Sequence, residues 1–328
     1  TARMGGEPGM LWHWSRLIDA PIALLLAAFR VVLPAETAEL ATRAIWPLLV
    51  LAPLLYVMAR AADNISGRPA ALITLALAAM CPLGLYQFAA GRIDHHNVMI
   101  AATLSAALLI CAFPATRARW AGAGALCGLA LAIGYEALAP VAALSFIVLV
   151  WGLFDGSRSR EACRFIDAFV LVFAICFLMT IPPDRWSDIR CDAISLNMVA
   201  LAVVGGAGAH LALSNAKRWS AMRLLSVTAA GGLAGVVSYG LLEPKCLAGP
   251  LAQLPKEIFP IWFAVIGENR SIVMDVLRGN FEQSLGLLVY YALGLVAAWK
   301  HHRTARDGQS LFLALAASMF VVCACWQY

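Results

Sequence analysis

The chain has 328 residues, of which 62% are hydrophobic and only 13% are charged, and its mean hydropathy is +0.80. Soluble domains average about 45–50% apolar and about 25% charged residues, so this composition excludes a water-soluble globule. It also excludes a disordered chain, which requires low hydrophobicity. The apolar runs are continuous rather than alternating, which excludes a spanning β-barrel. The net charge of +5 is modest and scattered, so nucleic acid is not an expected partner.

Ten apolar segments approach the roughly 20 residues that a helix needs to cross a bilayer. The expected spans are 44–59, 70–89, 98–114, 121–135, 138–154, 165–182, 193–215, 222–242, 283–299 and 310–327. A shorter apolar stretch at 20–34 carries Arg30 and predicts an interfacial or partly buried helix. The pattern therefore predicts an all-α polytopic membrane protein.

We expect a single transmembrane domain over 1–328, with two long loops that divide it. The first loop covers 1–43, eight spans follow over 44–242, the second loop covers 243–282, and two further spans occupy 283–328. Glycine- and alanine-rich runs within the spans predict faces on which helices pack closely.

The distribution of charge orients the spans. Short loops between alternate spans hold 13 of the 24 Lys and Arg residues, and short basic loops stay in the cytoplasm. The two long loops are then expected outside, together with 14 of the 19 acidic residues. Charges within the spans are nearly absent, which favours chemistry at the outer surface over transport through the membrane.

The outer loop between the second and third spans reads GRIDHHN, from Gly91 to Asn97. Asp94 and His96 are separated by one residue, and in an extended loop this spacing points both side chains the same way. A carboxylate and an imidazole together can hold a divalent cation with open positions, and this pair suits Mn²⁺ or Mg²⁺ better than a closed zinc site. Alternatively, Asp94 caps the third span, and His95 and His96 are interfacial polar residues.

Five further residues are candidates on the expected outer side, and the first is His95 of the same loop, a secondary candidate. Glu268, in the sequence VIGENRS, and Glu136, in IGYEALAP, are either site carboxylates or solvated side chains. Cys191 and Cys246 lie in polar loops in a compartment that permits disulfides, so we expect them to pair.

These motifs resemble those of a known family. GRIDHHN resembles the second acidic motif, of the DxD or DxH type, of the oligosaccharyltransferase catalytic-subunit family, which has the GT-C fold; archaeal members often carry DHH there. VIGE resembles a degenerate form of the TIxE motif in the long fifth external loop of that family. The stretch MLWHWSRLIDAP is similar to the first loop of related bacterial membrane glycosyltransferases. The order of long and short outer loops also matches, over most of residues 1–300.

The resemblance implies a glycosyltransferase of the bacterial inner membrane whose active site faces the periplasm. Such an enzyme moves a sugar or glycan from a polyprenyl-linked phosphate or pyrophosphate to a protein, glycan or lipid acceptor. Carried over, Asp94, His96 and Glu268 hold Mn²⁺ or Mg²⁺, and Asp94 and Glu268 are the candidate catalytic residues. Arg92 and Arg270 would contact the donor phosphate, or else be charges at the headgroup level.

Two departures from the family pattern shape the expectations. The only Asp of the first loop, Asp19, comes later than the family's first-loop acid, so we expect that acid upstream of Thr1, in a longer protein. The chain also lacks a soluble C-terminal domain with a WWD-type motif, so sequon-specific glycosylation is not implied. The alternatives are a secondary transporter or channel, or a non-catalytic GT-C-like subunit.

Overall fold

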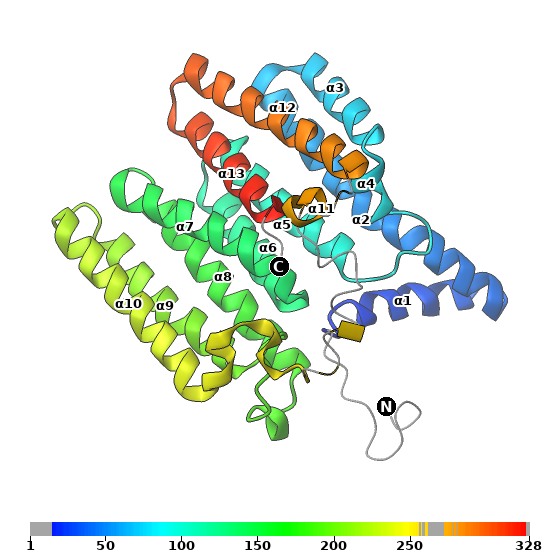
Figure 1. Cartoon of the computed structure of the whole chain (residues 1–328), viewed down its shortest axis with the longest axis horizontal. Helices are drawn as coiled ribbons and strands as arrows, with labels where there is room; N and C mark the ends of the chain where they lie inside the picture. The colour runs from blue at the N-terminus through cyan, green and yellow to red at the C-terminus, as the bar shows by residue number, and fades with distance from the viewer. Residues whose placement is uncertain are drawn as a thin grey trace.

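The computed structural model describes residues 15–255, 257, 260–261, 272–277, 279 and 281–325. In this part of the chain the regular elements are helices, arranged as a bundle of mostly antiparallel rods (Figure 1). The α-helices are α1 (Asp19–Arg30), α2 (Ala35–Ser66), α3 (Arg68–Ala79), α4 (Pro82–Tyr86), α5 (His96–Cys111), α6 (Arg117–Ile133), α7 (Leu138–Phe154), α8 (Ser159–Thr180), α9 (Leu196–Ser214), α10 (Ala221–Leu242), α11 (Ile272–Leu277), α12 (Phe281–Ala305) and α13 (Gly308–Cys325). Short 3₁₀ helices are η1 (Tyr135–Ala137), η2 (Pro183–Arg185), η3 (Pro244–Ala248) and η4 (Pro250–Gln253).

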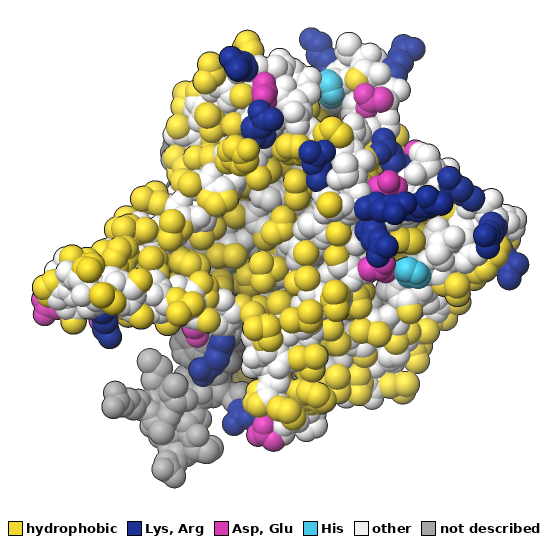
Figure 2. All heavy atoms as spheres, turned by 180° about the vertical axis from the view of Figure 1, so that it is seen from behind, with side chains coloured by type: hydrophobic (Ala, Val, Ile, Leu, Met, Phe, Trp, Pro, Cys, Tyr) yellow, Lys and Arg dark blue, Asp and Glu magenta, His cyan; other side chains and the backbone are white. Residues whose placement is uncertain are grey.

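Five of the described helices are long and apolar enough to cross a membrane: α2, η1 with α7, α8, α9 and α10. Helices α3, α5 and part of α13 are apolar but shorter. Hydrophobic side chains cover most of the face in Figure 2, whereas Lys and Arg gather towards its upper part. The chain is thus a helical membrane protein, and the count of ten spans stays a prediction.

The expected boundaries were wrong at two places. The span expected at 70–89 is interrupted, because α3 ends at Ala79 and the short α4 begins at Pro82. Proline lacks an N–H and disfavours helical geometry in the residue before it, and Cys81 is indeed non-helical, with φ −98° and ψ 84°. In addition, α2 begins at Ala35, so the end of the expected first loop is helical.

Glycines allow the central helices to approach backbone to backbone. A Cβ added at Gly124 of α6 would collide with the carbonyl oxygen of Phe165 in α8, and one added at Gly128 would lie 2.6 Å from the carbonyl oxygen of Phe169. The same arrangement joins α9 to α10, where a Cβ on Gly208 would lie 2.6 Å from the Cα of Gly231. The small-residue faces expected from the sequence are therefore confirmed.

One end of the bundle collects most of the candidate site residues. We call it the α5 end: α5, α7 and α9 begin there, and α6, α8 and α10 end there. An apolar cluster closes this end and contains residues from the ends of these helices, including Leu131, Phe177, Met198 and Tyr239. The candidate residues therefore lie next to a well-packed apolar cluster.

The close approach of α6 and α8 gives a test with a matched control on one helix. Alanine is the better helix former, so Gly122→Ala, whose new Cβ meets only a side-chain carbon at 3.9 Å, should leave stability unchanged or raise it slightly. Gly124→Ala should lower stability by roughly 1–3 kcal/mol, because the α8 backbone must move. Thermal unfolding of the detergent-purified protein measures both. Equal melting temperatures would contradict the packing.

Candidate functional site

Asp94 and His96 lie together at the start of α5. His96 Nδ1 is 3.3 Å from Asp94 Oδ1, and the backbone N–H of His96 donates to the same oxygen at 2.9 Å. The side chains therefore point the same way, as expected. Asp94 therefore accepts an N–H at the start of α5, although His95 occupies the N-cap position and makes no side-chain capping bond.

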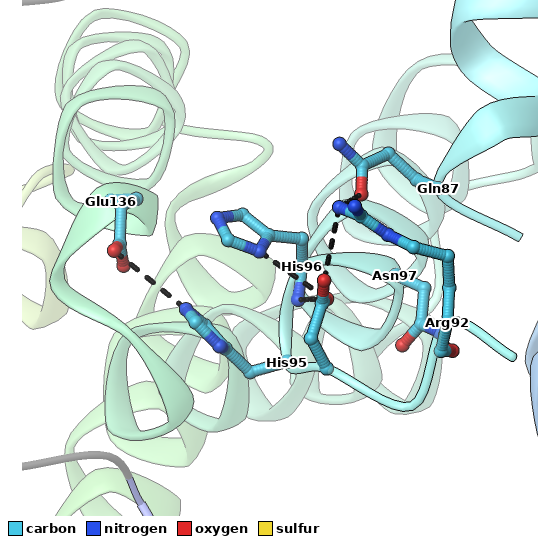
Figure 3. Close-up of polar contacts among 7 residues, drawn as sticks. Gln87, Arg92, His95, His96, Asn97 and Glu136 are labelled. Carbon is cyan, nitrogen blue, oxygen red and sulfur yellow. Dashed lines mark hydrogen bonds and ion pairs between the residues drawn. The ribbon is translucent and has the colours of Figure 1, made fainter. Parts of the chain in front are cut away.

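Arg92 completes this group on the other side of Asp94. Its Nη2 lies 3.0 Å from Asp94 Oδ2 and also donates to Gln87 Oε1, and its guanidinium stands 4.8 Å from the centre of the Tyr86 ring. Figure 3 shows Arg92 and Gln87 turned toward each other beside His96. The backbone is held as well, since Asn97 Nδ2 donates to the Arg92 carbonyl at 3.1 Å.

His95 turns the other way, toward the junction of α6 and α7. Its Nε2 is 3.7 Å from Glu136 Oε1, and the two side chains face each other in Figure 3. Glu136 sits in η1, directly after α6 ends at an extended Gly134 with φ −157° and ψ 144°. The structure thus brings Glu136 into the group around Asp94.

The ionised form of the Asp94 side chain is strongly favoured. Partial burial would raise its pKa, but the hydrogen bonds with His96 and the charges of His96 and Arg92 prevail and lower the pKa to about 2. The carboxylate is therefore ionised throughout the physiological range. An ionised carboxylate is what a metal site requires, whereas a general base works best with a pKa near the working pH.

Three donor atoms lie close enough together to be candidates for a cation site. Asp94, His95 and His96 each offer one ligand atom, and these atoms lie within 4.8 Å of one another. Two ligands about 2.1 Å from one ion and at right angles to each other are about 3 Å apart. The 3.3 Å between Asp94 Oδ1 and His96 Nδ1 is close to that separation, so a small side-chain adjustment would let both bind one ion.

Two of the expected site residues cannot be placed. Glu268 and Arg270 lie outside the described residues, so their expected roles stay predictions.

Cys191 and Cys246 form a disulfide, the pair expected from the sequence. It joins the loop between α8 and α9 to η3, after α10. Gln253 of η4 strengthens the same link, because its Oε1 accepts from the Cys191 N–H at 3.2 Å and its Nε2 donates to the Ile189 carbonyl at 3.1 Å. The first part of the expected long loop is therefore fixed to the α5 end.

One ionisable pair within the spans was not predicted from the sequence. His210 Nδ1 of α9 is 2.6 Å from Asp167 Oδ1 of α8. The sequence signal that could have revealed this pair is that Asp167 and His210 lie at similar depths in neighbouring antiparallel spans. Their side chains are 48% and 37% exposed, so the pair lies on the outside of the described bundle.

Comparisons with known proteins support the fold. No family model and no curated protein matches the sequence. Among solved structures, the chain is similar to the oligosaccharyltransferase of Archaeoglobus fulgidus in its apo form, with a TM-score of 0.64 over 97% of this chain and 13% sequence identity. The match covers 40% of that protein, so this chain spans about two fifths of its length. The chain therefore has an oligosaccharyltransferase-like fold.

Removing the disulfide should weaken the α5 end. In the chain-entropy account, a link across 55 residues stabilises by roughly 4 kcal/mol at most, and helices held in the membrane reduce that figure. We expect the double variant Cys191→Ser, Cys246→Ser to melt several degrees lower, measured by thermal unfolding in detergent. A reductant should lower the melting temperature of the native protein and leave the variant unchanged; an unaffected native protein would refute the link.

Proposed function

We propose that this chain is the membrane part of a metal-dependent glycosyltransferase. It moves a sugar or glycan from a polyprenyl phosphate or pyrophosphate to an acceptor on the extracytoplasmic face, in a bacterial inner membrane. The observation that carries the proposal is the joint geometry of Asp94, His96 and Arg92 at one end of an apolar bundle. The oligosaccharyltransferase-like fold supports it.

In the proposed reaction, the bond between the anomeric carbon and the phosphate oxygen breaks, and its electron pair leaves with the phosphate. The acceptor oxygen or nitrogen forms the new bond to the anomeric carbon and releases its proton to the surrounding water. A divalent cation bound by Asp94 and His96 would serve as a Lewis acid for the charge on the leaving phosphate. Asp94 keeps its negative charge for this purpose, because its pKa of about 2 makes it a poor proton acceptor.

Arg92 is suited to contact the donor phosphate. Its planar group has five N–H donors in a fixed fork, which matches the oxygens of a phosphate. The contacts with Asp94 and Gln87 both use Nη2, and the Tyr86 ring supports the guanidinium plane. These contacts fix the direction of the fork beside the donor atoms of Asp94 and His96. The lipid tail of the donor would lie along the apolar surface of the bundle.

Transport is the less favoured function. A transporter places its ionisable residues inside the bundle, near the middle of broken helices. The Asp167–His210 pair is exposed on the outside of the described bundle, and the charged group around Asp94 lies at its end. This distribution favours chemistry at a membrane surface.

The metal ligands are tested by substitution in the full-length protein. Asp94→Asn and His96→Ala should each lower transfer from a labelled polyprenyl-linked sugar in the presence of Mn²⁺ by on the order of 100-fold or more. Asp188→Asn is the matched control, because it removes the same charge from an exposed loop position. Unchanged transfer in both site variants, with the native protein active, would remove the assignment.

A substitution that keeps the positive charge of Arg92 but removes its planar guanidinium group tests its role. Arg92→Lys should lower kcat/KM for the donor by roughly tenfold, which is about 1.4 kcal/mol of transition-state stabilisation. Arg185→Lys, in the exposed η2, is the control and should be silent. An Arg92→Lys enzyme with native kcat/KM would mean that Arg92 acts only as a charge.

A further inference from the structure

Two carboxylate–imidazole pairs meet at the α5 end, and they come from different parts of the chain. Asp94 and His96 belong to the loop and first turn before α5, whereas Glu136, the partner of His95, belongs to the junction of α6 and α7. The two imidazole rings join the pairs, because their centroids are 4.2 Å apart and their planes are tilted by 31°.

The His95 ring is confined by its surroundings. Only 10% of its side chain is exposed, compared with 24% for His96. A Cβ added at Gly134 would lie 3.1 Å from the His95 ring, 2.6 Å from Glu136 Oε2 and 2.5 Å from Met99 Sδ. The end of α6 therefore leaves just enough room for His95 and Glu136 to face each other.

We propose that His95 supplies a third ligand to the cation of Asp94 and His96, and that Glu136 is the positioning residue that holds the His95 ring. The inference rests on the proposed function and deepens it. A nitrogen of His95 belongs to the group of donor atoms that lie within 4.8 Å of one another. An imidazole has two ring nitrogens, so one binds the ion while the other faces a carboxylate, an arrangement that fixes the orientation of the ring.

The third ligand determines which cation the site prefers. Carboxylate and water ligands suit Mg²⁺ and Mn²⁺ alike, whereas imidazole suits transition metals. A set of one carboxylate and two imidazoles, here Asp94, His95 and His96, therefore disfavours Mg²⁺ relative to Mn²⁺ and the other transition metals. With His96 as the single imidazole, the two ions would compete more evenly.

The first experiment counts the ligands in the native protein. The full chain, purified in detergent, is loaded with Mn²⁺ alone, and pulsed electron paramagnetic resonance counts the imidazole nitrogens coupled to the ion. We expect two in the native protein and one in each of His95→Gln and His96→Gln. A native protein with one coupled nitrogen overturns the inference, whatever the stability of the variants.

The second experiment tests Glu136 through the affinity for Mn²⁺. Glu136→Ala should raise the Kd about 10- to 100-fold and weaken the second nitrogen coupling. Glu136→Gln keeps an acceptor oxygen and should retain both couplings. Glu243→Ala removes a carboxylate that caps η3 at the same end, and should leave the Kd unchanged. A native Kd in Glu136→Ala overturns the positioning role.

The two proposals fail in different ways. If Mn²⁺ binds through a single nitrogen and Asp94→Asn abolishes binding, the third ligand is wrong and the proposed function stands. If the native protein binds no Mn²⁺, the metal-dependent function fails and the further inference fails with it.

Discussion

The contact between the backbones of α6 and α8 sets the position of much that surrounds the site. Gly124 and Gly128 leave no side chain between these helices, so their axes are held closer than larger residues would allow. The position of α6 in the bundle also sets the position of Gly134, at its end. Glu136 follows two residues later, so its contact with His95 depends on the same packing. Packing in the middle of the bundle therefore affects the positions of the polar residues at its end.

The polar group itself balances charge within a small volume. Asp94 and Glu136 supply two carboxylates, Arg92 supplies a permanent positive charge, and two imidazoles lie between them. Burying such groups without partners would be strongly unfavourable, and each has a partner in the structure. The arrangement is also asymmetric: Arg92 stands on one side of the imidazoles and Glu136 on the other (Figure 3). Molecules that approach the group from its two sides would therefore meet different electrostatic surroundings.

The sequence could predict the features that depend on short spacing. Asp94 and His96 are two residues apart, so local geometry brings them together, and most helices follow from long apolar runs. Cys191 and Cys246 could be paired because the charge pattern placed both on one side. The contact of His95 with Glu136 could not be predicted, because it depends on the end of α6 and on packing between residues 41 positions apart in the sequence. Pro82 indicated the break in the expected span 70–89, but the apolar composition of the whole segment favoured a continuous helix. Asp167 and His210 were missed because each lies alone within its own apolar run.

The cystine between Cys191 and Cys246 also bears on how the protein is assembled. It encloses the α9–α10 hairpin, so both sulfurs become neighbours only after that hairpin has been inserted and its two flanking loops have emerged on the same side. Such a bond persists where thiols are oxidised, and not in a reducing cytosol. Closure of the covalent ring would then hold the inserted hairpin in place, and an insertion error in either helix would leave both thiols unpaired.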